Sequence, residues 1–215
     1  MGFLDYVAKN AERILFLLLQ HVQVVLLSVA LATLVALIIA LGTERLPRIR
    51  RAALSVTGTI LTIPSFALFG LMIPLFGLGV LPTVLALTVY AVFPILRNTV
   101  TGLAGVDAGV VDAARGMGMG SRRRLLTVRL PLAWPIILNG VRVATIMVVA
   151  IAAIGAAVRG PGLGELIFRG LSRIGGANAL YEALSGVIAI AVVAALLDLL
   201  FILFGKLTTP RGLNV

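Results

Sequence analysis

Long stretches without a charged residue constrain this chain more than any other feature of its sequence. Residues 14–43 contain no Asp, Glu, Lys or Arg, and neither do residues 52–96. Because a membrane-spanning helix needs about 20 apolar residues, residues 22–41 are predicted to form a first span. The apolar region of a cleaved signal peptide is only about 7–15 residues long, so this stretch is interpreted as a retained helix.

The second uncharged stretch is long enough for two spans with a turn between them. Residues 76–82 contain two glycines and a proline, which mark a turn. Two further spans are predicted later in the chain, one interrupted by Arg142 and the other by Asp198. The predicted fold class is therefore an all-α integral membrane protein with five transmembrane helices, at residues 22–41, 54–75, 83–97, 132–158 and 183–205.

Composition excludes the other broad classes of protein. Hydrophobic residues make up 60% of the 215 residues and charged residues only 12%, whereas a soluble domain has about 45–50% and about 25%. A soluble fold of this size could not cover so much apolar surface with polar side chains. The chain contains no cysteine and one histidine, which excludes disulfides and thiolate metal sites and leaves too few ligands for a metal site.

The distribution of positive charge predicts how the chain is oriented. With five spans, thirteen Lys and Arg residues fall on one side of the membrane and five on the other. The richer side is expected in the cytoplasm, so the N-terminus is predicted to be outside and the C-terminus cytoplasmic. The formal charge of +10 is explained in this way, without a nucleic-acid partner. Residues 1–20 are then an external segment, 21–205 the membrane domain, 103–131 a cytoplasmic loop and 206–215 a cytoplasmic tail.

The loop at residues 103–131 is the most informative segment. Asp107 can cap a short helix through Ala114, and Gly116, Gly118 and Gly120 can end it, because glycine adopts positive φ without strain. Proline is favoured where a helix begins, as Pro131 would be for the fourth span. A short helix with small side chains suits a partner's groove or the lipid interface, and the residue types alone leave both open.

The spacing within this loop resembles a known family. Asp112-Ala113-Ala114, three residues, Gly118, nine residues, and then Val128-Arg129-Leu130-Pro131 is similar to the "EAA" loop of binding-protein-dependent ABC importer permeases. That family has Glu-Ala-Ala, Gly and Ile-x-Leu-Pro at the same spacing. The resemblance implies that Asp112, Ala113, Ala114, Gly118, Leu130 and Pro131 couple the permease to an ATPase.

Other segments narrow the resemblance to osmoprotectant permeases. Residues 62–77, 93–99, 113–119 and 162–170 are similar to members that import glycine betaine, choline, carnitine and related quaternary amines. The resemblance covers about residues 20–205, and Arg159-Gly160-Pro161 departs from the small residues that are usual there. It implies the type I importer permease fold of the methionine-permease kind, in a prokaryotic cell membrane.

The resemblance also implies partners. Such permeases work with two cytoplasmic ATPase subunits, a second permease chain that is the same or paralogous, an external solute-binding protein and membrane lipid. This chain has no G-x-x-x-x-G-K-[ST] motif, so it is expected to bind no cofactor itself and not to be an enzyme. A permease for another small solute, such as an amino-acid betaine, or a stand-alone secondary transporter, is the alternative.

Candidates for the solute pathway are Pro64, Ser65, Tyr90 and Asp198. Proline within a span frees carbonyls for a pathway, and charges within spans are often functional. Asp198 and Arg142 are expected to pair or to reach the interface in a structural role, and contact of Asp198 with a cationic solute is the alternative. His21 and Trp134 are interpreted as interfacial side chains, and residues 122–124, all arginines, as an anionic-lipid contact.

Overall fold

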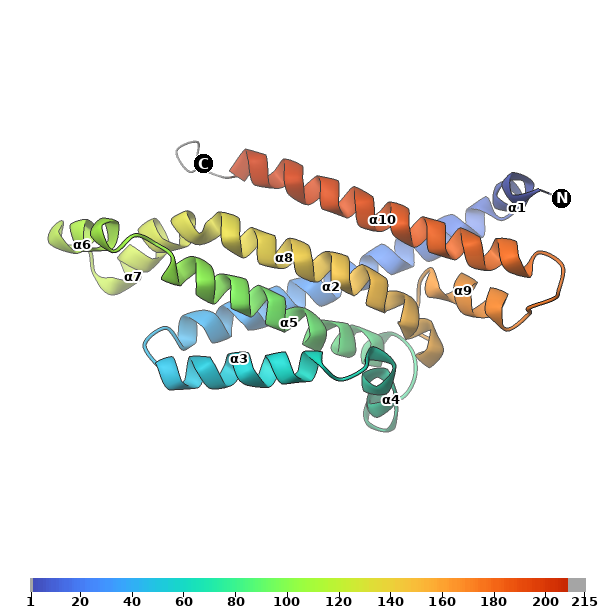
Figure 1. Ribbon diagram of the computed structural model, residues 1–215, viewed down its shortest axis with the longest axis horizontal. Coiled ribbons are helices and arrows are strands. Elements are labelled where there is room, and N and C mark those ends of the chain that lie inside the picture. Colours follow the sequence, from blue (N-terminus) through green and yellow to red (C-terminus); the bar gives the residue numbers. More distant parts are fainter. Residues whose placement is uncertain (1, 209–215) are drawn as a thin grey trace.

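The computed structural model describes residues 2–208 as an elongated bundle of helices (Figure 1). Four long helical segments run along the bundle, and α6 and α7 lie at one end while α1 and α9 lie at the other. We call these the α6 end and the α9 end. The helices, in chain order, are α1 (Phe3–Lys9), α2 (Ala11–Gly42), α3 (Pro47–Leu61), α4 (Ser65–Phe76), α5 (Val80–Ala104), α6 (Ala108–Gly116), α7 (Ser121–Arg124), the π-helical turn η1 (Leu125–Arg129), α8 (Leu130–Ala152), the 3₁₀ helix η2 (Ala153–Val158), α9 (Gly164–Leu171) and α10 (Ala179–Thr208).

The first long helix, α2, extends well beyond the predicted span. It starts at Ala11 and has 32 residues, which is about 48 Å at the rise of an α-helix and exceeds the ~30 Å hydrocarbon core of a bilayer. Its buried face carries the small residues Ala32, Ala36 and Ala40. Small side chains allow helix axes to approach closely, as packing between helices in lipid requires.

The predicted span at 54–75 is not one helix. It is divided into α3 and α4, which meet at an angle of 99°. Proline has no N–H to donate and disfavours helical backbone at the residue before it, and Pro64 stands directly before α4 with extended backbone (ψ 132°). The predicted turn follows α4, where Gly77 and Gly79 have φ of +75° and +108°.

The centre of the bundle is α5, which packs against α2 and α8. It continues beyond the predicted span at 83–97, from Val80 to Ala104. Glycine permits its close approach to α8, because a Cβ atom added at Gly140 would lie 2.5 Å from the Cβ of Asn98. The fully buried side chains of α5 include the large residues Leu87, Ile95 and Leu96 as well as Ala86 and Ala91.

By contrast, α10 lies at the periphery, and few of its residues are buried. Polar contacts attach it to the bundle at three levels. Glu182 near its start binds Arg13, Asp198 binds Arg142, and Thr208 at its end accepts a hydrogen bond from Trp134.

In the described residues, α2, α5, α10 and the continuous segment 121–158 are each long and apolar enough to cross a membrane, and the bent α3–α4 pair makes a fifth candidate. In Figure 1, α3 runs back along the bundle from the α6 end, and α4 lies across its far end. In the same view α1 lies at one end of the bundle and the end of α10 at the other.

Candidate functional site

The short helix α6 lies at the extreme end of the bundle (Figure 1). It begins as the sequence predicts, because the Oδ1 atom of Asp107 accepts a hydrogen bond from the backbone N–H of Val110 at 3.0 Å. Within the bundle α6 packs against α7 and η1. The contact area between α6 and the rest of the molecule therefore lies mainly on these two short elements.

Of the three glycines near the end of α6, the backbone conformation requires one. Gly118 has a φ of +80°, its N–H donates to the Arg115 carbonyl, and the N–H of Met119 donates to the Ala114 carbonyl. This is the Schellman arrangement, in which the residue with positive φ is usually glycine. Gly116 and Gly120 were also expected to permit positive φ, but neither adopts it.

The side chains of α6 divide into an outer and an inner set. Ala114 is 2% exposed and packs inward, whereas Asp112 and Ala113 face outward. The Asp112 side chain is 71% exposed and lies 3.9 Å from Arg115, a contact too solvated to hold the carboxylate. The exposed face of α6 therefore carries the carboxylate of Asp112 beside the small side chain of Ala113, and we call this helix with its exposed face the α6 knob.

The predicted basic stretch after α6 is helical. Residues 121–158 form a continuous helical path through α7, η1 and α8, with Leu130 and Pro131 in the first turn of α8, where proline was expected. The path contains a π-helical turn over Leu125–Arg129. Such turns are rare and often occur at functional sites.

Two residues that the sequence analysis overlooked join this region to the bundle. Arg129, the last residue of the π-helical turn, forms an ion pair with Glu44 beyond the end of α2, and its Nη2 donates to the Leu103 carbonyl of α5 at 2.9 Å. One sequence signal pointed to Glu44, which is the only acidic residue between Glu12 and Asp107.

The break between α3 and α4 brings together three of the four predicted pathway residues. Pro64 and Ser65 flank the break, and the buried Tyr90 of α5 donates a hydrogen bond of 2.6 Å to the carbonyl of Ile63. That carbonyl is at a helix end, where backbone groups lack helical partners. Tyr90 therefore stabilises the break.

Asp198, the fourth pathway candidate, lies elsewhere. It accepts two hydrogen bonds from Arg142 of α8, Nε to Oδ1 at 2.6 Å and Nη2 to Oδ2 at 2.8 Å. In Figure 1, α10 is on the opposite side of α8 from α3 and α4. The predicted pairing of these two charges within the spans is confirmed.

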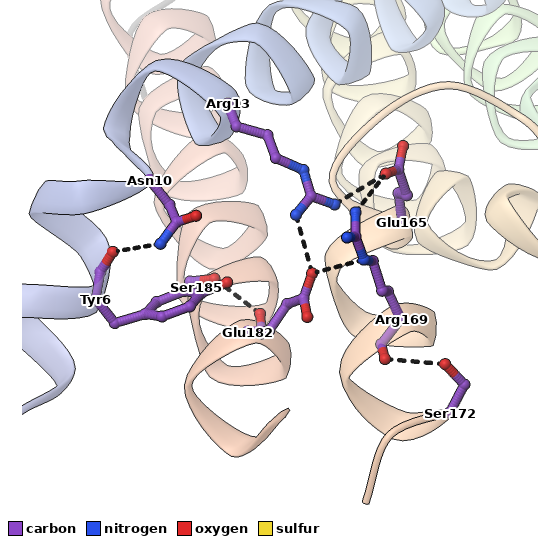
Figure 2. Close-up of polar contacts among 8 residues, drawn as sticks. All are labelled: Tyr6, Asn10, Arg13, Glu165, Arg169, Ser172, Glu182 and Ser185. Carbon is purple, nitrogen blue, oxygen red and sulfur yellow. Dashed lines mark hydrogen bonds and ion pairs between the residues drawn. The ribbon is translucent and has the colours of Figure 1, made fainter. Parts of the chain in front are cut away.

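At the α9 end, an ion-pair network joins α2, α9 and α10. Figure 2 shows Arg13 of α2 between Glu165 of α9 and Glu182 of α10, with Arg169 of α9 completing the square. The Glu182 side chain is only 8% exposed and is approached by both arginines, at 3.0 and 3.4 Å. Burial and the nearby Glu182 carboxylate raise the pKa of Tyr6 above its ordinary value.

His21 does not lie at an interface, contrary to the sequence interpretation. It is fully buried, with Nε2 3.1 Å from the carbonyl of Val149 and Gly162 directly against Nδ1. The helix α2 starts ten residues before His21, so this residue lies inside the bundle. No group of three potential metal ligands occurs among residues 2–208.

Solved structures with the same fold include chains of ABC transporters. One is a chain of the MetNI methionine ABC transporter in an inward-facing conformation, with a TM-score of 0.81 and 20% identity, covering 92% of this chain and 96% of that one. Another is a chain of an amino acid ABC transporter, with a TM-score of 0.73 and 22% identity, covering 98% and 99%.

Curated relatives match over nearly the full length of both chains. The osmoprotectant import permease protein OsmW of Salmonella typhimurium is 36% identical over 219 residues and covers 100% of each chain. The glycine betaine/carnitine/choline permease protein OpuCB of Bacillus subtilis is 31% identical, covering 98% of this chain and 95% of the relative. The choline permease protein OpuBB of Bacillus subtilis is also 31% identical, covering 98% and 95%.

Residues 28–211 match a single family, the inner membrane component of binding-protein-dependent transport systems. Members of this family work with a binding protein and an ATPase, and they are not the ATPase themselves. The family resemblance is thus confirmed by a match that covers most of the chain. The chain belongs to the binding-protein-dependent permeases, as a multi-pass component of the inner membrane.

Proposed function

We propose that this chain is the permease subunit of an ATP-driven importer of quaternary amine osmoprotectants such as glycine betaine, choline or carnitine. The observation that carries the proposal is full-length similarity, at 31–36% identity, to permeases whose names state these solutes. The solute enters from an external binding protein and leaves to the cytoplasm.

The working transporter contains two permease chains, the same or paralogous, and two cytoplasmic ATPase subunits. Each ATPase receives one α6 helix. The exposed Asp112 and Ala113 form the contact surface, Ala114 packs inward, and Gly118 sets the exit of the helix. Leu130 and Pro131 connect this region to α8.

The chain crosses the membrane five times, with the N-terminus outside and the C-terminus in the cytoplasm. Support comes from charge, since thirteen of the 18 Lys and Arg residues belong to the α6 side in this topology. The α6 end is then cytoplasmic and the network around Glu182 is external. The arginines at 122–124 lie where anionic headgroups are available.

Transport follows alternating access, with the solute near the middle of the membrane. ATP shifts the equilibrium because the ATPase pair has a different affinity for nucleotide in the two states. As the ATPases close, they draw the two α6 helices together, and the attached spans move from the inward-open to the outward-open arrangement.

The pathway passes the break between α3 and α4. Non-helical backbone at membrane depth is tolerated where it lines a cavity or is buried in protein, and Pro64 and Ser65 provide such a segment, fixed by Tyr90. Asp198 is already neutralised by Arg142, which favours a structural role over contact with a cationic solute.

Reconstitution tests this function. The permease is purified with its co-expressed ATPase and reconstituted into sealed vesicles. The binding protein and labelled glycine betaine, choline or carnitine are added on the side of the membrane opposite the ATPase. Uptake that requires ATP and the binding protein is expected. Uptake driven by an ion gradient without the ATPase would identify a stand-alone secondary transporter. ATP-dependent uptake restricted to an amino-acid betaine would identify a permease for a different small solute.

A further inference from the structure

Three chain segments meet at one guanidinium group at the α6 end. Arg129 forms an ion pair with Glu44, which follows α2. It also donates to the carbonyl of Leu103, the penultimate residue of α5, at 2.9 Å. Arg129 itself directly precedes α8. One side chain therefore connects the ends of the three helices that form the centre of the bundle.

The surroundings of this contact strengthen it. The side chains of Arg129 and Glu44 are 22% and 25% exposed, and a partly buried pair is less screened by salt than a surface pair. Leu103, whose carbonyl accepts from Arg129, belongs to an apolar cluster with Ala133 and Ile137, against which Leu41, Leu125 and Leu130 pack. The three helix ends are packed together and are not joined by the ion pair alone.

The contact between Arg129 and Glu44 lies where the segment that follows α6 joins the bundle. The α6 helix is connected to the bundle by a short link to α5 on one side and by α7 and the π-helical turn on the other. A π-helical turn is an irregular part of a helix and can absorb a displacement by local rearrangement. Arg129 is its last residue, so the pair with Glu44 fixes the turn where it enters α8.

We propose that Arg129, paired with Glu44, is a positioning residue for energy coupling: it makes α2, α5 and α8 move as one body when α6 is displaced by the ATPase. The proposal rests on the proposed function, because it assigns a role within ATP-driven import. It differs from the contact made by α6 itself, since neither Arg129 nor Glu44 lies on the α6 knob.

The test measures solute taken up per ATP hydrolysed by the complete transporter in vesicles. Coupling between sites is typically worth a factor of about 5–150, so Arg129→Gln is expected to lower this ratio at least ~5-fold while the ATPase still co-purifies in the usual amount. Arg129→Lys keeps the charge but not the two-armed geometry, and it should restore part of the ratio.

A double-mutant cycle identifies the partner. If Arg129 acts through Glu44, then Glu44→Gln should lower the ratio too, and the double variant should be no worse than Arg129→Gln alone. The matched control is Arg48→Gln, because Arg48 is exposed at the start of α3 and forms no ion pair within residues 2–208. This control should keep the ratio of the unmodified protein.

Two results would overturn the proposal. One is an unchanged ratio in both Arg129→Gln and Glu44→Gln. The other is a parallel loss of ATPase activity and uptake together with a lower melting temperature, which would mean that the pair only stabilises the fold. Failure of the unmodified transporter to show ATP-dependent uptake would instead refute the proposed function.

Discussion

Replacement of Gly118 by alanine should weaken binding of the ATPase, although it neither removes nor adds a contact between side chains. A Cβ atom at this position meets nothing within 4 Å, so there is no clash. The backbone, however, has a φ of +80°, and a left-handed conformation costs a residue with a Cβ about 1–2 kcal/mol. The cost falls on the turn that ends α6.

The magnitude follows from the weak attachment of α6. This helix has nine residues and packs against α7 and η1, so a strained end is relieved by unwinding its last turn. If binding restores the turn, the whole cost appears in the affinity. About 1–2 kcal/mol corresponds to a ~5- to 30-fold higher dissociation constant.

Two further variants isolate the cause. Gly118→Asn should lose less affinity than Gly118→Ala, because asparagine visits the left-handed region more readily. Gly116→Ala is the matched control, since Gly116 also has open space around it but lies within the helix, where alanine is favoured over glycine. The assay is titration of the purified ATPase onto the permease in nanodiscs. Equal losses for the two alanine variants, or none for Gly118→Ala, would refute this reasoning.

Three other substitutions test separate parts of the molecule. Asp112→Lys should abolish co-purification of the ATPase and leave the melting temperature of the permease unchanged, because the side chain is 71% exposed; an unchanged yield of complex would contradict a role for this carboxylate in docking. Tyr90→Phe leaves the Ile63 carbonyl without its partner, and it should lower the free energy of unfolding by about 1–3 kcal/mol, measured as a lower melting temperature in detergent. Asp198→Asn leaves Arg142 without its counter-ion, so it should lower stability more than uptake per folded molecule; intact expression with no uptake would show a solute contact instead.

The sequence predicts which segments form long apolar helices much better than where each helix ends. Uncharged stretches mark the spans, because lipid excludes unpaired charges. The predicted span covers only about 20 residues of the uncharged stretch 14–43, whereas α2 starts at Ala11. The helix includes the charged Arg13 because Glu182, 169 residues away in the chain, compensates its charge. The same long-range packing explains why His21 is buried and not interfacial.

Local rules predicted the α6 region well, because its features depend on neighbouring residues. The cap by Asp107 and the positive φ of Gly118 both follow from short-range backbone chemistry. The 99° angle between α3 and α4 exceeds what a proline alone specifies, since it also depends on Tyr90. Pairing of Arg129 with Glu44 joins residues 85 positions apart, and no local pattern indicates it.

The central claim is that the α6 knob faces the cytoplasm and receives the ATPase. The chain has no cysteine, so a single cysteine at Met117, which is 71% exposed, can be labelled selectively. A membrane-impermeant maleimide should label this residue in inside-out vesicles but not in right-side-out vesicles, and added ATPase should protect it. Labelling from the outer side, or equal labelling with and without bound ATPase, would contradict the account.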